Sequence, residues 1–293
     1  MSRERALAIV NPAAGKGAGA RLMPRIARDL AAAGVDADVV ATPAPGEAAR
    51  LASHAVEEGY TRVIAVGGDG TANEVANGLV DTAATLVLYP IGLGNDFARA
   101  LGYPRKRKQI ASFINRAQRR RIDVGEANGR VFLNAAGVGI DGHVAERVRA
   151  VSGIVGPALG YFVGSLASIA TFEPPRMRIR IDGQTREGPH MMVLAANGTY
   201  FGSGMRVAPH AKLDDGMFDV IVGGDLSRWQ SIVSLTKIYR GAHIDGKTIF
   251  QFRASSVDVD FDGPLPGQLD GEFTRVSGLR MRVRPRALTV LGR

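Results

Sequence analysis

The sequence contains no cysteine, which removes several kinds of chemistry at once. Disulfides, thiolate metal sites and a cysteine nucleophile are all excluded. The absence of cysteine also fits a reducing compartment. The first residues, Met1 to Ala6, lack the long apolar segment of a signal peptide. We therefore expect a cytoplasmic protein.

Long uncharged segments are scarce as well. One of them is long enough that a membrane-spanning helix has to be considered. Ala150 to Phe172 carries no charge and is long enough to cross a bilayer. Its glycines, its proline and its serines make it only moderately apolar. We therefore predict a loop followed by a buried or groove-lining helix, and a transmembrane helix is the less favoured alternative. The helix would present Leu159, Phe162, Val163, Leu166 and Ile169.

Acidic side chains are in the minority, and the net charge is +9. Such a charge attracts anionic partners, meaning a membrane surface, nucleic acid or a nucleotide. Much of the excess lies in Arg105–Lys108 and Arg119–Arg121. Aromatic side chains that would stack on bases are missing there, apart from Phe113. We therefore expect peripheral contact with an anionic membrane and no nucleic acid, with a solvated linker as the alternative. A homodimer is compatible with the sequence.

Glycine-rich loops follow three predicted strands in the first hundred residues. The strands are short apolar runs, typical of buried parallel strands. Three strand–loop–helix units in succession predict a doubly wound parallel α/β sheet, which binds ligands at the carboxyl ends of its strands. The strands end at Val10, Val66 and Tyr89, and the loops are Asn11–Gly19, Gly67–Thr71 and Pro90–Arg99.

The loop from Gly67 to Thr71 has the pattern of a phosphate site. Its glycines allow close approach to the backbone, and a helix start directs free N–H groups at an anion. Thr71 and Glu74 have the spacing of a capping box. Asp69 is the exception, because a carboxylate repels phosphate. It suggests a bridging Mg²⁺ or hydrogen bonds to a ribose or an attacking hydroxyl, and an ordinary strand-to-helix turn is the alternative.

The other two glycine loops add weaker signals. Asn11–Gly19 has the composition of a phosphate cradle but does not match the Walker A pattern, and Lys16 is either a phosphate contact or a solvated side chain. Asn95 and Asp96 would either cap a helix or, together with Asp69, hold a nucleotide.

The pattern changes after Arg121 to short alternating segments separated by turn residues, which predicts a β-sandwich. One helix is expected over Arg228–Tyr239. The predicted domains are residues 1–125 and 126–284, and the last strand, within 285–293, could return to the first domain. The predicted strands are Val131–Ala135, Met177–Ile181, Met191–Ala196, Phe218–Val222, Val257–Phe261 and Leu279–Arg284.

Two acidic clusters stand out in the second half. Lys212–Asp219 places three carboxylates around a glycine turn and would suit a hard cation such as Mg²⁺, although an ordinary Asp-Gly turn is favoured on spacing alone. In Gln268–Phe273, Asp270 and Glu272 flank a glycine. This segment is either a hairpin turn or the carrier of a catalytic base at Glu272.

These motifs together resemble the lipid-kinase family of bacterial diacylglycerol kinases, sphingosine kinases and ceramide kinases, over essentially the whole chain. Gly-Gly-Asp-Gly alone is shared with NAD kinases and 6-phosphofructokinases, whereas Asn-Asp-Phe and the late Asp-Gly-Glu are not. In order, the motifs are Asn11-Pro12 with Gly15, Gly67–Thr71 with Asn73-Glu74, Gly92 with Asn95–Phe97, Asn134 with Gly137, Asn197-Gly198, Leu213–Gly216 and Asp270–Glu272.

The resemblance implies an N-terminal nucleotide domain, a C-terminal lipid-binding β-sandwich and an active site in the cleft between them. ATP and Mg²⁺ are the implied cofactors, with Glu272 as the general base and Asp69 orienting Glu272 or a metal-bound water. A structural Mg²⁺ would be held by Asp215 and the carbonyls of Lys212 and Met217. The implied ATP contacts are Asn11, Pro12, Ala13, Ala14, Gly15, Thr42, Gly67, Gly68, Asp69, Gly70, Thr71, Asn73, Leu93, Asn95 and Asp96.

One position departs from the family pattern. The family usually has threonine where this chain has Leu93, so a hydroxyl that contacts the nucleotide is lost. A lipid kinase acting on a membrane lipid, with diacylglycerol as the leading acceptor, is the favoured interpretation. A lipid-binding pseudokinase and a soluble small-molecule kinase of the NAD-kinase type are the alternatives.

Overall fold

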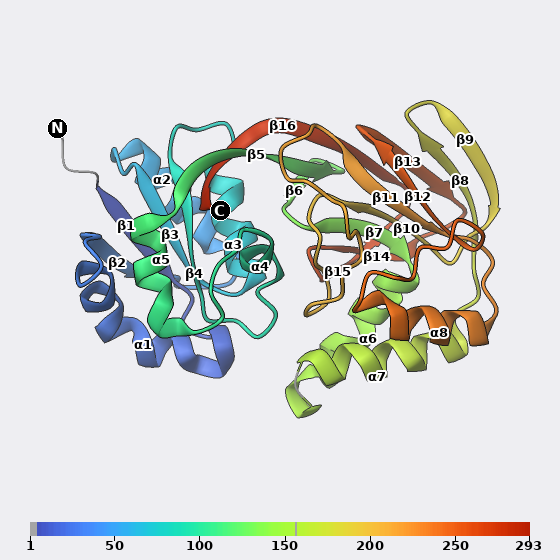
Figure 1. The fold of residues 1–293 in the computed structure, drawn as a ribbon, viewed down its shortest axis with the longest axis horizontal. Coiled ribbons are helices and arrows are strands. Elements are labelled where there is room, and N and C mark those ends of the chain that lie inside the picture. Colours follow the sequence, from blue (N-terminus) through green and yellow to red (C-terminus); the bar gives the residue numbers. More distant parts are fainter. Residues whose placement is uncertain (1–4, 156) are drawn as a thin grey trace. The chain divides into compact units, whose positions relative to one another are not determined.

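The computed structural model describes residues 5–155 and 157–293, those from 148 to 161 by their backbone alone. The chain forms two compact units (Figure 1). Unit 1 contains the residues up to Ile122 together with Arg286–Arg293, and unit 2 contains Asp123–Pro285. The chain passes between the units within β5 (Gln118–Ala127) and again within β16 (Leu279–Gly292).

Unit 1 is an α/β domain with a parallel sheet, as the sequence predicts. The strand order is β2-β1-β3-β4, and the end of β16 continues it parallel to β4. Its other elements are β1 (Ala6–Val10), α1 (Ala14–Ala31), β2 (Ala37–Ala41), α2 (Glu47–Glu57), β3 (Arg62–Gly67), α3 (Asp69–Leu79), β4 (Thr85–Pro90), α4 (Asp96–Ala100), the 3₁₀ turn η1 (Arg107–Gln109) and α5 (Ile110–Arg116).

Burial explains why the strands of this sheet are apolar throughout. Val63, Ile64 and Val66 of β3 are all fully buried. Strands covered on both faces by helices have no solvent side to carry polar residues. The strand order also reverses at β1, which has β2 on one side and β3 on the other. The loops after β1 and β3 therefore lie at a topological switch point, where such sheets bind ligands.

The start of α3 differs from the predicted capping box. The helix begins at Asp69, with Gly68 at the N-cap and no side-chain cap. Thr71 Oγ1 accepts a hydrogen bond from Asn11 Nδ2 at 3.1 Å, and Glu74 Oε2 accepts one from the Ala48 N–H at 3.2 Å. Both side chains thus form hydrogen bonds to other elements and do not cap α3, so the capping-box prediction is wrong.

Unit 2 consists of two antiparallel sheets, which confirms the predicted sandwich. One contains β9, β8, β13 and the first part of β16, and the other has the order β12-β11-β10-β7-β14-β15. The strands are β6 (Arg130–Phe132), β7 (Ala135–Gly139), β8 (Arg176–Ile181), β9 (Gln184–Pro189), β10 (Met192–Ala196), β11 (Phe218–Gly223), β12 (Ile249–Ala254), β13 (Ser256–Phe261), β14 (Leu265–Leu269) and β15 (Glu272–Val276).

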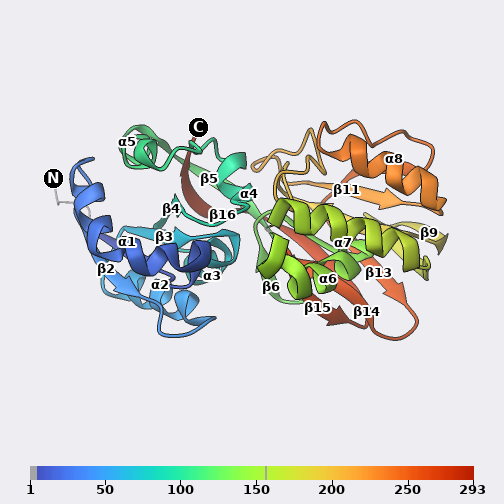
Figure 2. The ribbon, with the colours of Figure 1, turned by 90° about the horizontal axis from the view of Figure 1, so that it is seen from below.

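Strand β10 shows how the core of unit 2 is layered. Val193 and Ala195 belong to one apolar cluster with residues of both sheets, and Leu194 and Ala196 belong to a second. The second cluster includes residues of α7 (Pro157–Thr171) and α8 (Arg228–Ile238), which pack on the other face of this sheet (Figure 2). The strand is apolar on both faces because both are covered.

The uncharged segment is helical from its start, so the predicted loop is wrong. Helix α6 (Ile140–Val155) runs into it, and α7 continues after residue 156. The two helices pack against each other. Of the helices that the structure describes, none combines the length and the apolar character that a bilayer crossing needs.

The predicted strand Val131–Ala135 is interrupted. Strand β6 ends at Phe132 and β7 begins at Ala135. Between them the N–H groups of Leu133 and Asn134 donate to the Asp270 carboxylate, both at 2.7 Å. The chain leaves the strand there because a distant side chain takes its hydrogen bonds.

Candidate functional site

The loop after β1 is tied to the loop after β3 by one asparagine. The Asn11 N–H donates to the Val66 carbonyl at 3.0 Å, and Asn11 Oδ1 accepts from the Ala13 N–H at 3.0 Å. Its Nδ2 reaches Thr71 of α3, as described above. One side chain thus fixes the relative position of two glycine loops that lie far apart in the sequence.

Two glycines allow the loop after β4 to join this group. A Cβ on Gly92 would lie 2.5 Å from the Gly68 Cα, and one on Gly15 would lie 2.4 Å from the Ile91 carbonyl oxygen. Neither position accepts a side chain without displacing backbone. Gly15 is the second residue of α1, but its φ of 60° and those of Lys16 and Gly17 are left-handed, so the chain there is not helical and continues the loop. The three predicted loops therefore meet at one edge of the parallel sheet.

Asp69 connects the second loop with the third. Its Oδ1 accepts a hydrogen bond from the Phe97 N–H, in the first turn of α4, at 3.0 Å. Burial raises the pKa of this carboxyl, and hydrogen bonds from the backbone of residues 95–97 offset part of that effect. The carboxylate therefore holds the loops together, a use that the sequence did not reveal.

Asn95 and Asp96 serve the third loop itself. Asn95 lies at the N-cap position of α4 with φ at 52°, but its side chain does not cap the helix. Its Nδ2 donates to the Gly92 carbonyl at 2.6 Å. Asp96 is buried, and its Oδ1 accepts from Arg99 Nη1 at 3.2 Å. The Leu93 side chain, earlier in the same loop, is 56% exposed.

The remaining predicted contacts lie on the same edge or next to it. The Thr42 N–H donates to the Val10 carbonyl at 2.8 Å, so Thr42 is beside the first loop. Gly70, Thr71 and Asn73 belong to the first turns of α3. The first N–H groups of a helix have no acceptor within it and favour an anion. Unit 1 therefore brings the predicted nucleotide residues together.

In unit 2, the Asp-Gly-Glu motif forms the turn between β14 and β15. Glu272 is the first residue of β15; its side chain is 58% exposed and lies 3.5 Å from Arg130 Nη2. Asp270 has φ at 48° and accepts hydrogen bonds from three consecutive N–H groups, those of residues 133 to 135. Asp270 therefore anchors the turn, and Glu272 is presented to solvent.

The predicted metal loop is anchored by an acid that the sequence did not single out. Asp123, almost fully buried, accepts from the Gly216 N–H through Oδ2 at 2.6 Å. Asp215 accepts from the Met217 N–H at 3.2 Å and is paired with Arg253. A cation at Asp215 would have to replace that arginine. Within the described part of the chain, no group of three His, Asp or Glu side chains is arranged to hold a metal ion.

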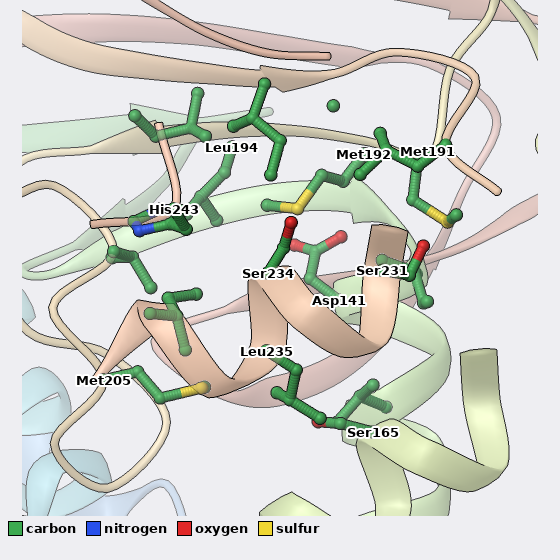
Figure 3. Close-up of a pocket in the computed structure, with 18 of the residues that line it drawn as sticks. Asp141, Ser165, Met191, Met192, Leu194, Met205, Ser231, Ser234, Leu235 and His243 are labelled. Atoms are coloured by element: carbon green, nitrogen blue, oxygen red, sulfur yellow. The ribbon is translucent and has the colours of Figure 1, made fainter. Parts of the chain in front are cut away.

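An apolar cavity of about 130 Å³ lies in unit 2, lined by strands of the six-stranded sheet and by helices α6, α7 and α8 (Figure 3). Of the predicted groove residues, Ile169 lines it, and Phe162 and Leu166 pack on the same apolar cluster. Val163 is 44% exposed, and the Leu159 side chain lies outside the described residues. The polar residues that line the cavity are Asp141, Ser165, Ser231, Ser234 and His243.

The chain therefore combines an α/β unit that carries glycine loops with an antiparallel sandwich, and both parts match known domain families. Residues 5–127 match the diacylglycerol kinase catalytic domain, and residues 134–292 match the YegS C-terminal NAD kinase β-sandwich-like domain. The chain belongs to the diacylglycerol kinase family, and it is a lipid kinase, a phosphotransferase.

Individual relatives agree with this assignment. The chain is 32% identical over 277 residues to a diacylglycerol kinase of Bacillus subtilis, covering 92% of this chain and 90% of the relative. It is 30% identical over 276 residues to a diacylglycerol kinase of Staphylococcus carnosus, covering 92% and 89%. A crystal structure of a diacylglycerol kinase from Bacillus anthracis superposes with a TM-score of 0.79 at 26% identity, covering 100% of this chain and 98% of that one.

Proposed function

We propose that this lipid kinase transfers the γ-phosphate of ATP to the primary hydroxyl of diacylglycerol, giving phosphatidic acid. The use of ATP is supported by one observation, the convergence of three glycine loops at the switch point of the parallel sheet. Diacylglycerol as the acceptor is supported by the apolar cavity of unit 2 and by the relatives, which are diacylglycerol kinases.

The loops suit a polyphosphate. Phosphate oxygens need several backbone N–H groups close together, and Gly67, Gly68 and Gly92 let α3 and the second and third loops pack without a side chain between them. Asp69 orders the loops through the Phe97 N–H. Together with the neighbouring residues Asn11–Gly15, Thr42, Thr71, Asn73, Leu93, Asn95 and Asp96, these groups form the ATP site that we propose.

The transfer requires positioning and charge neutralisation more than covalent help from the protein. Bound Mg²⁺ would neutralise part of the charge of the triphosphate. We assign a structural Mg²⁺ to Asp215 with the carbonyls of Lys212 and Met217, where the ion would take the place of the Arg253 guanidinium. Glu272 accepts the proton of the lipid hydroxyl, and its exposure leaves the carboxylate accessible to a substrate.

The test is phosphate transfer from labelled ATP with Mg²⁺ to lipids in mixed micelles. The panel contains diacylglycerol, a sphingoid base, ceramide and phosphatidylglycerol. We expect labelled phosphatidic acid from diacylglycerol at the highest rate. Phosphorylation of NAD without any lipid, or the absence of every lipid product, would contradict the proposal.

The departure at Leu93 gives a prediction of increased affinity. Leu93→Thr restores a hydroxyl at an exposed loop position, so the fold should be unaffected. One added hydrogen bond is expected to tighten ATP binding about 3- to 10-fold. Calorimetry of both proteins with ATP would measure it, with Leu93→Val as the control of similar shape that lacks the hydroxyl. Equal tightening by both variants would remove the hydroxyl as the cause.

The basic cluster gives a prediction about the membrane. Lys106 and Arg107 are exposed, and each basic residue at an anionic surface contributes about 1 kcal/mol. Lys106→Gln/Arg107→Gln is therefore expected to weaken binding to phosphatidylglycerol vesicles about tenfold or more at low salt. Co-sedimentation would measure this, with Arg25→Gln/Arg28→Gln as a matched exposed pair on α1. Binding that does not depend on anionic lipid would refute a membrane role for the cluster.

A further inference from the structure

Asp141 is an acidic side chain in an otherwise largely apolar cavity. It is the second residue of α6, is 9% exposed and lines the cavity (Figure 3). Its Oδ2 accepts a hydrogen bond from Gln268 Nε2 at 3.2 Å. Its Oδ1 has no hydrogen-bond partner among residues 5–155 and 157–293. A buried oxygen left without a partner is costly, so it is expected to have one when the cavity is filled.

The position of this carboxyl is fixed by close packing. A Cβ on Gly137 of β7 would lie 2.2 Å from Asp141 Oδ2 and 2.8 Å from Leu194 Cδ1. A Cβ on Gly142 would lie 2.3 Å from the backbone of Pro266. The two glycines allow the start of α6 to press against β7 and β14. The carboxyl is therefore held by close packing beside β7, and Asp141 as a residue lines the cavity.

The same carboxyl is connected to the turn that carries Glu272. Gln268 is fully buried, and its Oε1 accepts from the Gly271 N–H at 2.9 Å. Because that oxygen is engaged, the Gln268 amide must donate to Asp141. One glutamine thus links Asp141, which lines the cavity, to Gly271, the residue before Glu272.

Protonation decides what Asp141 offers to a ligand. Burial raises its pKa to about 7, and the hydrogen bond from Gln268 offsets part of the rise. The neutral acid can donate a hydrogen bond, whereas the carboxylate can only accept. Titratable or charged groups on the elements around it include His143, Glu146 and Arg147 on α6, Glu272 and Arg275 on β15, Arg228 and Lys237 on α8, and His243, which also lines the cavity.

On the basis of the proposed function, we propose that the Asp141 carboxyl donates a hydrogen bond to an ester carbonyl of the acylglycerol whose chains enter the cavity. An ester carbonyl lies within a few bonds of the hydroxyl that is phosphorylated, which matches the link from Asp141 through Gln268 to the Glu272 turn. A dialkyl ether has the same chains but no carbonyl. Asp141 therefore selects acyl lipids over alkyl lipids.

The test compares dioctanoylglycerol with its dioctyl ether, by calorimetric binding and by kcat/KM, at pH 6. Wild type is expected to prefer the ester about 3- to 10-fold, the value of one hydrogen bond. Asp141→Ala should lose the preference, whereas Asp141→Asn, which keeps a donor, should retain it. Ser234→Ala is the matched control, because it removes a different polar group of the same cavity.

A pH series separates this role from a structural one. The preference of wild type should fall as the pH rises from 6 to 8.5, because the ionised carboxylate cannot donate. In Asp141→Asn it should stay constant. Equal binding of ester and ether by wild type, no measurable binding of either, or an ester preference that survives Asp141→Ala would overturn the inference. Ester-selective binding without phosphate transfer would refute the proposed function alone.

Discussion

Replacing Glu272 with glutamine is expected to lower lipid phosphorylation about 10²- to 10⁴-fold, the usual contribution of a general base. ATP affinity should be unchanged, because Glu272 belongs to unit 2 and the proposed ATP residues belong to unit 1. Stability should change little as well, since Glu272 is more than half exposed and pairs with Arg130 only at the surface. Turnover in mixed micelles and calorimetry with ATP would measure both effects.

A second glutamate provides the matched control. Glu187 lies on β9 of the same unit, its side chain is 52% exposed, and it pairs with Arg178 at 2.6 Å. Glu187→Gln therefore removes a similar charge and a similar surface pair without touching the β14–β15 turn. It should keep wild-type turnover. Near-normal turnover in Glu272→Gln, or an equal loss in both variants, would remove Glu272 from the role of base.

Replacing Gly92 with alanine is expected to abolish measurable ATP binding at millimolar concentrations and to destabilise unit 1. The new Cβ would lie 2.5 Å from the Gly68 Cα and 2.8 Å from Asn95 Oδ1, so two loops must separate. Overpacking of this kind typically costs about 1 to 3 kcal/mol. The N–H groups at the start of α3 would then no longer face the third loop. Calorimetry with ATP and a thermal melt would record both effects.

The control for that variant is a glycine with room for a side chain. A Cβ on Gly224, after β11, would lie 3.4 Å from the Thr248 carbonyl oxygen, an ordinary contact. Gly224→Ala should bind ATP as wild type does. Unchanged ATP affinity in a folded Gly92→Ala protein would mean that the convergence of the loops is not the nucleotide site.

The local elements follow directly from the sequence. Strands β1, β3 and β4 were predictable because each is a short run buried on both faces, and α1 was predictable because Leu22, Ile26 and Leu30 repeat at the helical period. The three glycine loops could also be located from the sequence. Their signal is a strand, a glycine cluster and a helix start within about ten residues.

The roles of single polar side chains were less accessible. Thr71 and Glu74 have the spacing of a capping box, but both are used by neighbouring elements. For Asp69 the sequence suggested a role toward a metal ion, a ribose or an attacking hydroxyl, and only the structure shows that its Oδ1 also accepts from the Phe97 N–H. A spacing rule describes what a side chain can do locally, and tertiary partners compete for the same atoms.

The sequence by itself determined the two architectures and the three glycine loops, because these depend on periodicity and on short motifs. The tertiary structure decided which distant groups meet. Asp123 anchors Gly216 across 93 residues, Asp270 holds Asn134 across 136, and Gln268 reaches Asp141 across 127. No local pattern encodes these pairs, because each forms only when strands and helices pack and an otherwise unpaired buried polar group finds its partner.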